Sequence, residues 1–168
     1  MTDERIKQFK EKCETAMNQS EFGDLKQHDL YKWIFEYGAT LMSEPLDKMN
    51  PDTLIRMGGK LAGLMPNLGQ DLARARAERD VYEQKAKEMG KEIVLSYLAN
   101  GEYKVTEAKA RAELEMTELS ELVVIKDGDK NKLENLHEAC RAMVSFIQSV
   151  LSLRKQSLFN DNLENNAR

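Results

Sequence analysis

Basic and aromatic side chains alternate through the middle of this chain of 168 residues, around Tyr97 and Tyr103. Proteins hold single-stranded nucleic acid with this combination, because cations bind the phosphates and aromatic rings stack against the bases. We therefore predict single-stranded DNA binding in this part of the chain, through phosphate contacts without base specificity. The predicted contact residues are Arg74, Arg76, Lys91, Lys104, Lys109 and Arg111.

The same stretch also fits a solvated helix surface, because Glu78, Glu83, Glu88 and Glu107 lie between the basic residues. The chain has 25 basic and 29 acidic residues and a net charge of −4. Residues 70–111, with nine basic and eight acidic residues, form the only stretch that is not acidic. A closed ring of several copies would present this weakly basic surface repeatedly and would bind through avidity.

The motifs that would indicate catalysis or a metal are incomplete. Gly58-Gly59-Lys60 lacks the earlier glycine and the following Ser or Thr of a phosphate-binding loop. Residues 127–138 match several positions of a calcium-binding loop, but Lys132 replaces the glycine of its sharp turn. His137 and Cys140 are two ligands, and a structural zinc site needs four. We therefore expect no enzymatic activity, no cofactor and no metal.

Helices must position these residues. Three prolines and nine glycines are few, and residues that favour helices are abundant. The predicted fold is all-α: long amphipathic helices in an antiparallel hairpin or coiled-coil bundle, with a smaller N-terminal helical region. No apolar stretch is as long as a membrane span, and no secretory signal follows the charged N-terminus. We expect a cytoplasmic protein without membrane contact, whose Cys13 and Cys140 stay reduced.

The N-terminal helical region is predicted at residues 1–66. Pro45 ends or turns one of its helices, and Asn50-Pro51 is typical of a helix start, because proline at the first helical position loses no hydrogen bond. Glycines between residues 53 and 65 disfavour a long helix there. The predicted helices are at about residues 3–18, 24–41 and 53–65.

A long-helix region is predicted at residues 67–159. Its apolar residues recur at alternating spacings of three and four, which is the requirement for a coiled coil. Asn100-Gly101 predicts the end of one helix, and Asp127-Gly128-Asp129 predicts a turn. Long helices are therefore expected from about residue 67, at about residues 105–125, and from about residue 133. Residues 160–168, rich in Asn, are predicted to be a frayed tail.

The apolar faces of these helices are wide enough for contacts within one chain and between chains. An elongated chain has little interior of its own, so self-association is the simplest way to bury such faces. We therefore predict a homo-oligomer. The predicted interface residues are Leu72, Tyr82, Met89, Ile93, Leu136, Met143, Ile147 and Val150.

Three segments between residues 70 and 158 follow one another in a distinctive order. A charged helix ends in LSYLANGEY at residues 95–103, KVTEAKARAE follows at residues 104–113, and an amphipathic helix ends in Arg154-Lys155. In this order the chain resembles the phage recombination mediators of the UvsY type. The resemblance implies a non-enzymatic, ring-forming phage protein that binds single-stranded DNA. It also implies that the protein engages a recombinase and a single-strand-binding protein and helps to load the recombinase filament.

A second hypothesis has no role for DNA. The acidic net charge and the N-terminal region outside the resemblance favour a phage-type interaction protein, for instance an inhibitor or adaptor of a host or defence protein. Only the DNA-binding hypothesis predicts a steep loss of oligonucleotide binding with salt, because counterions are released when phosphates are neutralised.

Overall fold

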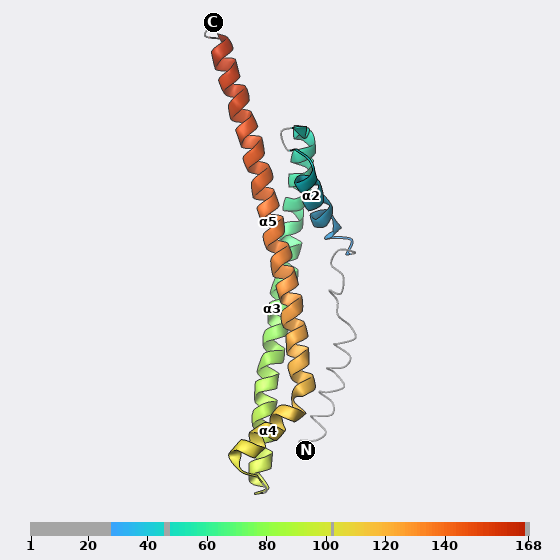
Figure 1. Ribbon diagram of the computed structural model, residues 1–168, viewed down its shortest axis with the longest axis vertical. Coiled ribbons are helices and arrows are strands. Elements are labelled where there is room, and N and C mark those ends of the chain that lie inside the picture. Colours follow the sequence, from blue (N-terminus) through green and yellow to red (C-terminus); the bar gives the residue numbers. More distant parts are fainter. Residues whose placement is uncertain (1–27, 46–47, 102, 167–168) are drawn as a thin grey trace. The chain divides into compact units, whose positions relative to one another are not determined.

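The computed structural model describes residues 28–45, 48–101 and 103–166, and this part of the chain is helical without strands (Figure 1). The helices are α2 (Lys32–Ser43), α3 (Pro51–Ala99), α4 (Val105–Glu115) and α5 (Thr117–Asn166). The all-α prediction is therefore confirmed. The helix predicted at residues 3–18 lies outside the described residues. None of the helices searched is long and apolar enough to cross a membrane.

The described chain forms two compact regions, each considered by itself. The charged region is residues 72–132, and it contains the end of α3, the whole of α4 and the start of α5. The leucine-rich region is residues 28–71 together with 133–166, and it contains α2, the start of α3 and the rest of α5. The division falls after Asp71 and again after Lys132. The boundary that the sequence predicts after residue 66 stays a prediction.

The helix α3 is continuous through the position where the sequence predicts an end to the helix at 53–65. It begins as predicted, because the Asn50 side chain accepts a hydrogen bond of 2.8 Å from the backbone N–H of Asp52. Pro66 lies within the helix on an exposed face. Leu64 and Leu68 on either side of it are buried, and their burial offsets the hydrogen bond that proline removes.

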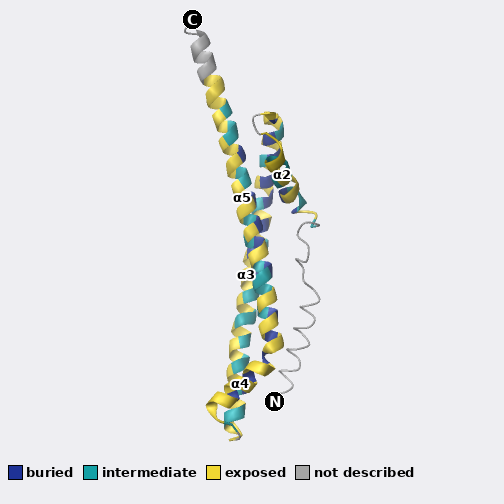
Figure 2. Ribbon diagram, in the orientation of Figure 1, coloured by how far each residue is buried: buried dark blue, intermediate teal, exposed yellow. Residues whose placement is uncertain are grey.

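In the leucine-rich region α3 and α5 run antiparallel. The Cys140 thiol lies 3.4 Å from the carbonyl oxygen of Leu61, and Arg154 donates a 2.7 Å hydrogen bond to the carbonyl of Met49. A side chain at Gly58 would place its Cβ 3.2 Å from Cγ2 of Ile147, so glycine permits the close approach of the two helices. The buried side chains of this core are Leu54, Met57, Leu61, Leu64, Leu68, Leu133, Leu136, Cys140 and Ile147 (Figure 2).

The helix α2 is the third helix of the leucine-rich region, and it contacts both of the others. Its flanking residue Tyr31 is fully buried and donates a hydrogen bond to the carboxylate of Asp71 on α3. Burial and this hydrogen bond raise the pKa of the Tyr31 hydroxyl. A Cβ at Gly38 would lie 3.5 Å from the sulfur of Met143 on α5. The core of the leucine-rich region therefore lies between three helices, α2, α3 and α5.

The predicted turn at Asp127-Gly128-Asp129 is wrong, because α5 continues through it. Asp127 forms ion pairs there with Arg79 and Lys130 (both 3.5 Å) rather than capping a turn. The interruption lies instead at Met116, between α4 and α5, where Thr117 donates a 2.8 Å hydrogen bond to the carbonyl of Leu114. The backbone of α5 remains helical to Asn166, past the start of the predicted frayed tail.

The predicted stop after α3 is confirmed. The helix ends at Ala99, and Gly101 has a φ of 68°, the left-handed conformation that favours glycine. This turn leads into α4, which packs back onto the end of α3. The core of this hairpin end consists of Ile93, Ala112, Met116, Leu119 and Leu122.

Candidate functional site

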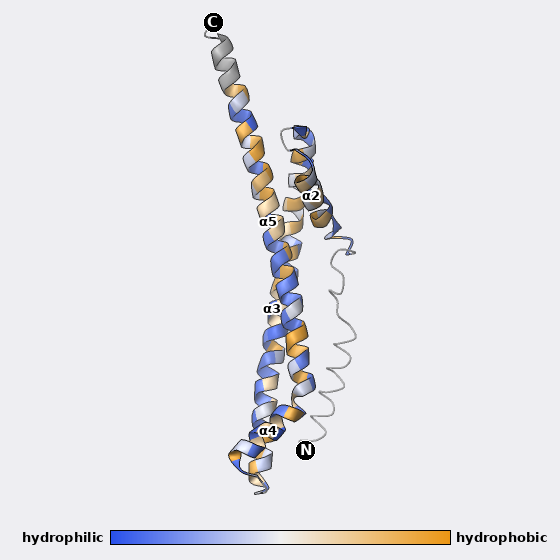
Figure 3. Cartoon of the chain, viewed as in Figure 1, coloured by the Kyte–Doolittle hydropathy of each residue, from blue (hydrophilic) through white to orange (hydrophobic). Residues whose placement is uncertain are grey.

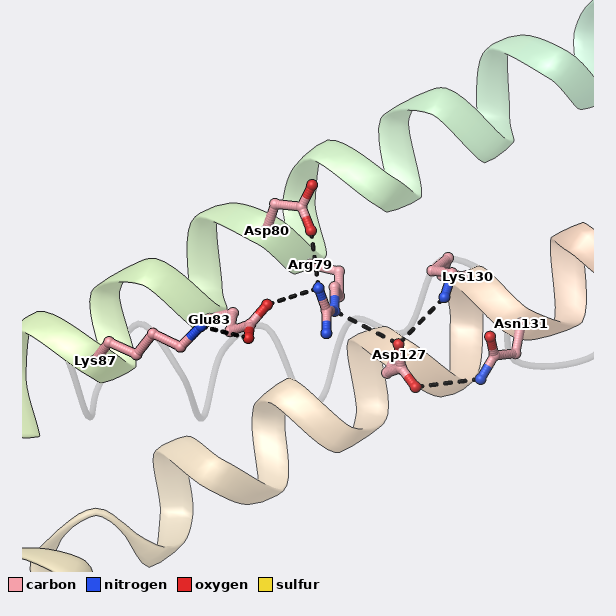
Figure 4. Close-up of polar contacts among 7 residues, drawn as sticks. All are labelled: Arg79, Asp80, Glu83, Lys87, Asp127, Lys130 and Asn131. Carbon is pink, nitrogen blue, oxygen red and sulfur yellow. Dashed lines mark hydrogen bonds and ion pairs between the residues drawn. The ribbon is translucent and has the colours of Figure 1, made fainter.

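Charged side chains occupy the middle of the charged region, where α3 and α5 face each other (Figure 4). The guanidinium of Arg79 lies 2.6 Å from Glu83 and 3.0 Å from Asp80 on its own helix. It also reaches across to Asp127 of α5, at 3.5 Å. The ammonium of Lys126 on α5 lies 2.9 Å from Glu78 on α3. These contacts tie α3 and α5 together through charges, beside the apolar core of the hairpin end.

The charge network lowers the pKa values of two glutamates. For Glu78, burial alone would raise the pKa, but the hydrogen bonds and charges of Lys126 and Arg74 outweigh it. For Glu83, the hydrogen bond from Lys87 (2.7 Å) and the charge of Arg79 lower the pKa. Both carboxylates therefore remain ionised to lower pH than ordinary glutamates do.

Asp129 is the most deeply buried charged side chain of the described residues, at 4% exposure. Its carboxylate lies 3.4 Å from the ammonium of Lys132, which is itself half exposed. Asp129 stands where the spacing of buried residues along α5 would place an apolar side chain, four residues before Leu133. A buried carboxylate with one distant partner stabilises a fold weakly, if at all.

Beside this network, toward the end of the hairpin, lies a groove of about 810 Å³. Its apolar lining comes from α3, from α4 and from the start of α5. A Cβ at Gly90 would meet nothing within 4 Å. The apolar and small lining residues are Ala86, Gly90, Val94, Leu95, Ala112, Met116 and Val123.

Three lysines and two glutamates also line this groove. Lys91 and Lys109, both predicted as nucleic-acid contacts, meet here from α3 and α4. The sequence prediction omitted Lys87, although it precedes Lys91 by four residues and therefore lies on the same helix face. The acidic members are Glu83 and Glu113, so the lining carries one net positive charge.

The predicted aromatic residues form a cluster with Arg111. The rings of Tyr97 and Tyr103 meet edge to face, with 5.4 Å between their centroids. The guanidinium of Arg111 lies 4.4 Å from the centroid of the Tyr103 ring, and the Tyr97 hydroxyl donates a hydrogen bond to Glu115. This hydrogen bond raises the pKa of Tyr97. The contacts within the chain fix both rings and cover part of the surface on which a base would stack.

The remaining predicted contacts lie apart from the groove. Arg74 forms an ion pair of 3.1 Å with Glu78, which reduces its availability to phosphates. Arg76 is exposed on α3, 15 residues before Lys91, a separation of about 22 Å along a helix. Lys104 immediately precedes α4, where its backbone N–H donates to Glu107 (3.3 Å). The structure therefore groups Lys91 with Lys109 and leaves Arg74 and Arg76 outside this group.

The predicted interface residues lie mostly within the hairpin of a single chain. Leu72, Ile93, Leu136 and Ile147 are buried in that chain, and Tyr82 and Met89 pack against its core. Met143 and Val150 are partly buried. These residues contribute to packing within one chain, and contact between chains stays a prediction. Side chains already buried in one chain are poor candidates for that contact.

The groove and its surroundings are suited to binding by charge and apolar contact. Within the described residues, no three His, Cys, Asp or Glu side chains gather as a metal site would require. No family model, curated protein or solved structure matches this chain.

Proposed function

We propose that the protein is a non-enzymatic oligomer that binds single-stranded DNA and assists recombinase loading, in the manner of a recombination mediator. The observation that carries the proposal is the meeting of Lys91 and Lys109 at one groove, joined by Lys87. These ammonium groups come from α3 and α4, which share one apolar core in the charged region. They offer phosphates several cations in a fixed arrangement, without groups that would read bases.

Self-association supplies the rest of the affinity in this proposal. One groove carries too little net charge for tight binding, whereas a ring repeats it in every copy. Apolar side chains outside the hairpin core support such contacts, because a chain gains by burying them against another copy. On α5 these are Phe146, Leu153, Leu158 and Phe159, which are 44% to 66% exposed.

The test is a salt titration of binding to a labelled single-stranded oligonucleotide. The wild-type oligomer should lose affinity steeply as salt rises, and Lys91→Glu with Lys109→Glu should weaken binding roughly tenfold or more at low salt. The control is Lys48→Glu with Lys155→Glu, which changes the net charge equally at two exposed positions outside the charged region. The proposal fails if the intact oligomer binds no oligonucleotide at low salt, or if both double variants bind equally.

A protein-binding role without DNA is the second candidate. It is favoured by the apolar lining of the groove, which fits the apolar face of an amphipathic helix better than it fits phosphates. In that case the partner would be a host or defence protein, and oligonucleotide binding would be absent at every salt concentration.

A further inference from the structure

The leucine-rich region carries a second group of basic and aromatic side chains. Trp33 is the single tryptophan of the chain and lies partly exposed on α2. The ammonium of Lys60 on α3 lies 3.8 Å from the centroid of the Trp33 ring, and the ammonium of Lys32 lies 5.7 Å from it. The ring of Tyr37 is beside that of Trp33, with 5.7 Å between their centroids. The packing of α2 on α3 therefore brings two aromatic rings together with cations from both helices.

Two cations of this surface have no carboxylate partner in the part of the chain that the structure describes. Lys60 and Arg56 are exposed on α3 and form no ion pair there, whereas Lys32 lies 3.4 Å from Asp29. Arg56 precedes Lys60 by four residues, so both side chains project from one face of the helix, about 6 Å apart along its axis. An anion bound at this face would therefore meet two cations that no carboxylate of the described residues neutralises.

The surface of α3 beside these cations is open. Gly59 and Gly63 lie on the same face of the helix as Arg56 and Lys60, and a Cβ at either glycine would meet nothing within 4 Å. The glycines recognise no ligand by themselves. They leave room for a flat group to approach the helix backbone next to the cations.

Single-stranded nucleic acid combines the two chemistries that this surface offers. Its phosphates pair with ammonium and guanidinium groups, and its unpaired bases stack on aromatic rings, whereas an acidic peptide supplies carboxylates alone. We infer that Trp33, Lys60 and Arg56 form a second contact surface for single-stranded DNA, with the cations on phosphates and the indole against a base.

The Lys60 ammonium over the Trp33 ring is compatible with this role. Stacking of a base on an aromatic ring is a stronger contact than a cation over the ring at an exposed site, so a base can take the place of the ammonium. The displaced ammonium then pairs with the phosphate of the same strand. This surface takes the ligand of the proposed function, and in that respect rests on it, but it shares no residue with the groove.

The first experiment follows the fluorescence of Trp33 in the full-length chain, where no other tryptophan contributes. A thymidine oligonucleotide should quench the emission of the wild type, and at higher concentration that of Lys91→Glu with Lys109→Glu, because the second surface is intact in that variant. Poly-glutamate, which is anionic but has no rings, should leave the emission unchanged. Equal quenching by poly-glutamate would refute the base contact. Oligonucleotide binding detected by anisotropy without any change in emission would refute the second surface and leave the proposed function standing.

The second experiment separates the charge from the ring, with the anisotropy of a labelled oligonucleotide as the readout. Lys60→Gln should weaken binding roughly threefold or more at low salt, whereas Lys155→Gln, which removes the same charge at an exposed position of α5, should change it little. Trp33→Phe keeps a ring and should bind nearly as the wild type does, and Trp33→Leu should bind roughly fivefold or more weakly. Circular dichroism checks that each variant is folded, and Lys60→Gln decides alone if Trp33→Leu is not. Equal binding by the two lysine variants, or by the two folded Trp33 variants, would refute the second surface.

Discussion

The leucine-rich and charged regions use the same two long helices in different ways. In the leucine-rich region, Leu61, Leu68 and Leu133 form a dry core that α2 covers. In the charged region, Arg79 forms ion pairs with Glu83 on its own helix and with Asp127 on the opposite helix. Lys126 forms an ion pair with Glu78 on the opposite helix. Figure 3 shows the contrast along α3, which is mostly hydrophilic beside its label, whereas α2 and the upper half of α5 are richer in apolar residues.

Stability and the alignment of the helices have different sources in the two regions. Apolar burial contributes in proportion to area and tolerates shifts in register, whereas pairs such as Arg79 with Asp127 form in one register only. The charged pairs contribute little net stability, because desolvation offsets their attraction. We therefore expect the leucine-rich region to supply most of the stability and the charged region to fix the alignment of the helices.

The largest expected effect comes from placing a charge in the apolar core. Ile147 is 1% exposed, so Ile147→Asp should cost about 4 kcal/mol or more, because its carboxylate would be buried without a partner. Urea unfolding followed by circular dichroism measures the loss. Ser149→Asp, at an exposed position one half-turn away, is the control and should change stability little. A stable Ile147→Asp variant would contradict the assignment of the core to this region.

Replacing a buried charge in the charged region with an apolar side chain should raise the stability of the protein. Asp129→Leu removes a buried carboxylate whose nearest cation is 3.4 Å away and replaces it with an apolar side chain. We expect stability to rise by about 1 to 2 kcal/mol in urea unfolding. Glu121→Leu on the exposed face of α5 is the control, with an expected change near zero. Destabilisation by Asp129→Leu would mean that this carboxylate holds the hairpin together.

A smaller effect should appear on acidification, through Glu78 in the charged region. The pKa of Glu78 is lower in the folded chain than its ordinary value of about 4.3, so its contribution is complete above that pH and is lost as the pH falls through the folded value. Its share should be about 0.5 to 1 kcal/mol. Thermal unfolding at pH 7 and pH 3 measures the loss, which Glu78→Gln should reduce. If Glu78→Gln lost as much stability between pH 7 and pH 3 as the wild type does, Glu78 would not be the cause of the loss.

Much of this architecture is predictable from the sequence. The spacing of apolar residues predicts the all-α class and the long helices. Asn50, Pro51 and Gly101 mark where α3 begins and ends, and they can be recognised in the sequence because their effect on the backbone is local. The glycines between residues 53 and 65 mislead, and so does Gly128, because the low helix propensity of glycine does not end a helix that is packed against others. Packing of the neighbouring turns against the partner helix decides both positions.

The candidate site was only partly predictable. The charges of Lys91 and Lys109 are visible in the sequence, but their meeting depends on how α4 folds back, and the groove depends on small residues such as Gly90. The boundary between regions does have a sequence signal. Leu64, Leu68 and Leu72 are spaced by four and four, a shift in the repeat that ends where the charged region begins.

The smallest effect compares one glycine from each region. Gly59 and Gly90 both lie inside α3, and a Cβ at either meets nothing within 4 Å in the described residues. Alanine restricts the unfolded chain and favours the helix, so Gly59→Ala should stabilise the protein by about 0.4 to 1 kcal/mol. Gly90→Ala should give a similar gain, because the backbone there is helical and a Cβ is accommodated in the same way. Paired urea titrations of the two variants measure the difference. A loss of stability at either position would mean that the surface of α3 does not accommodate a Cβ there.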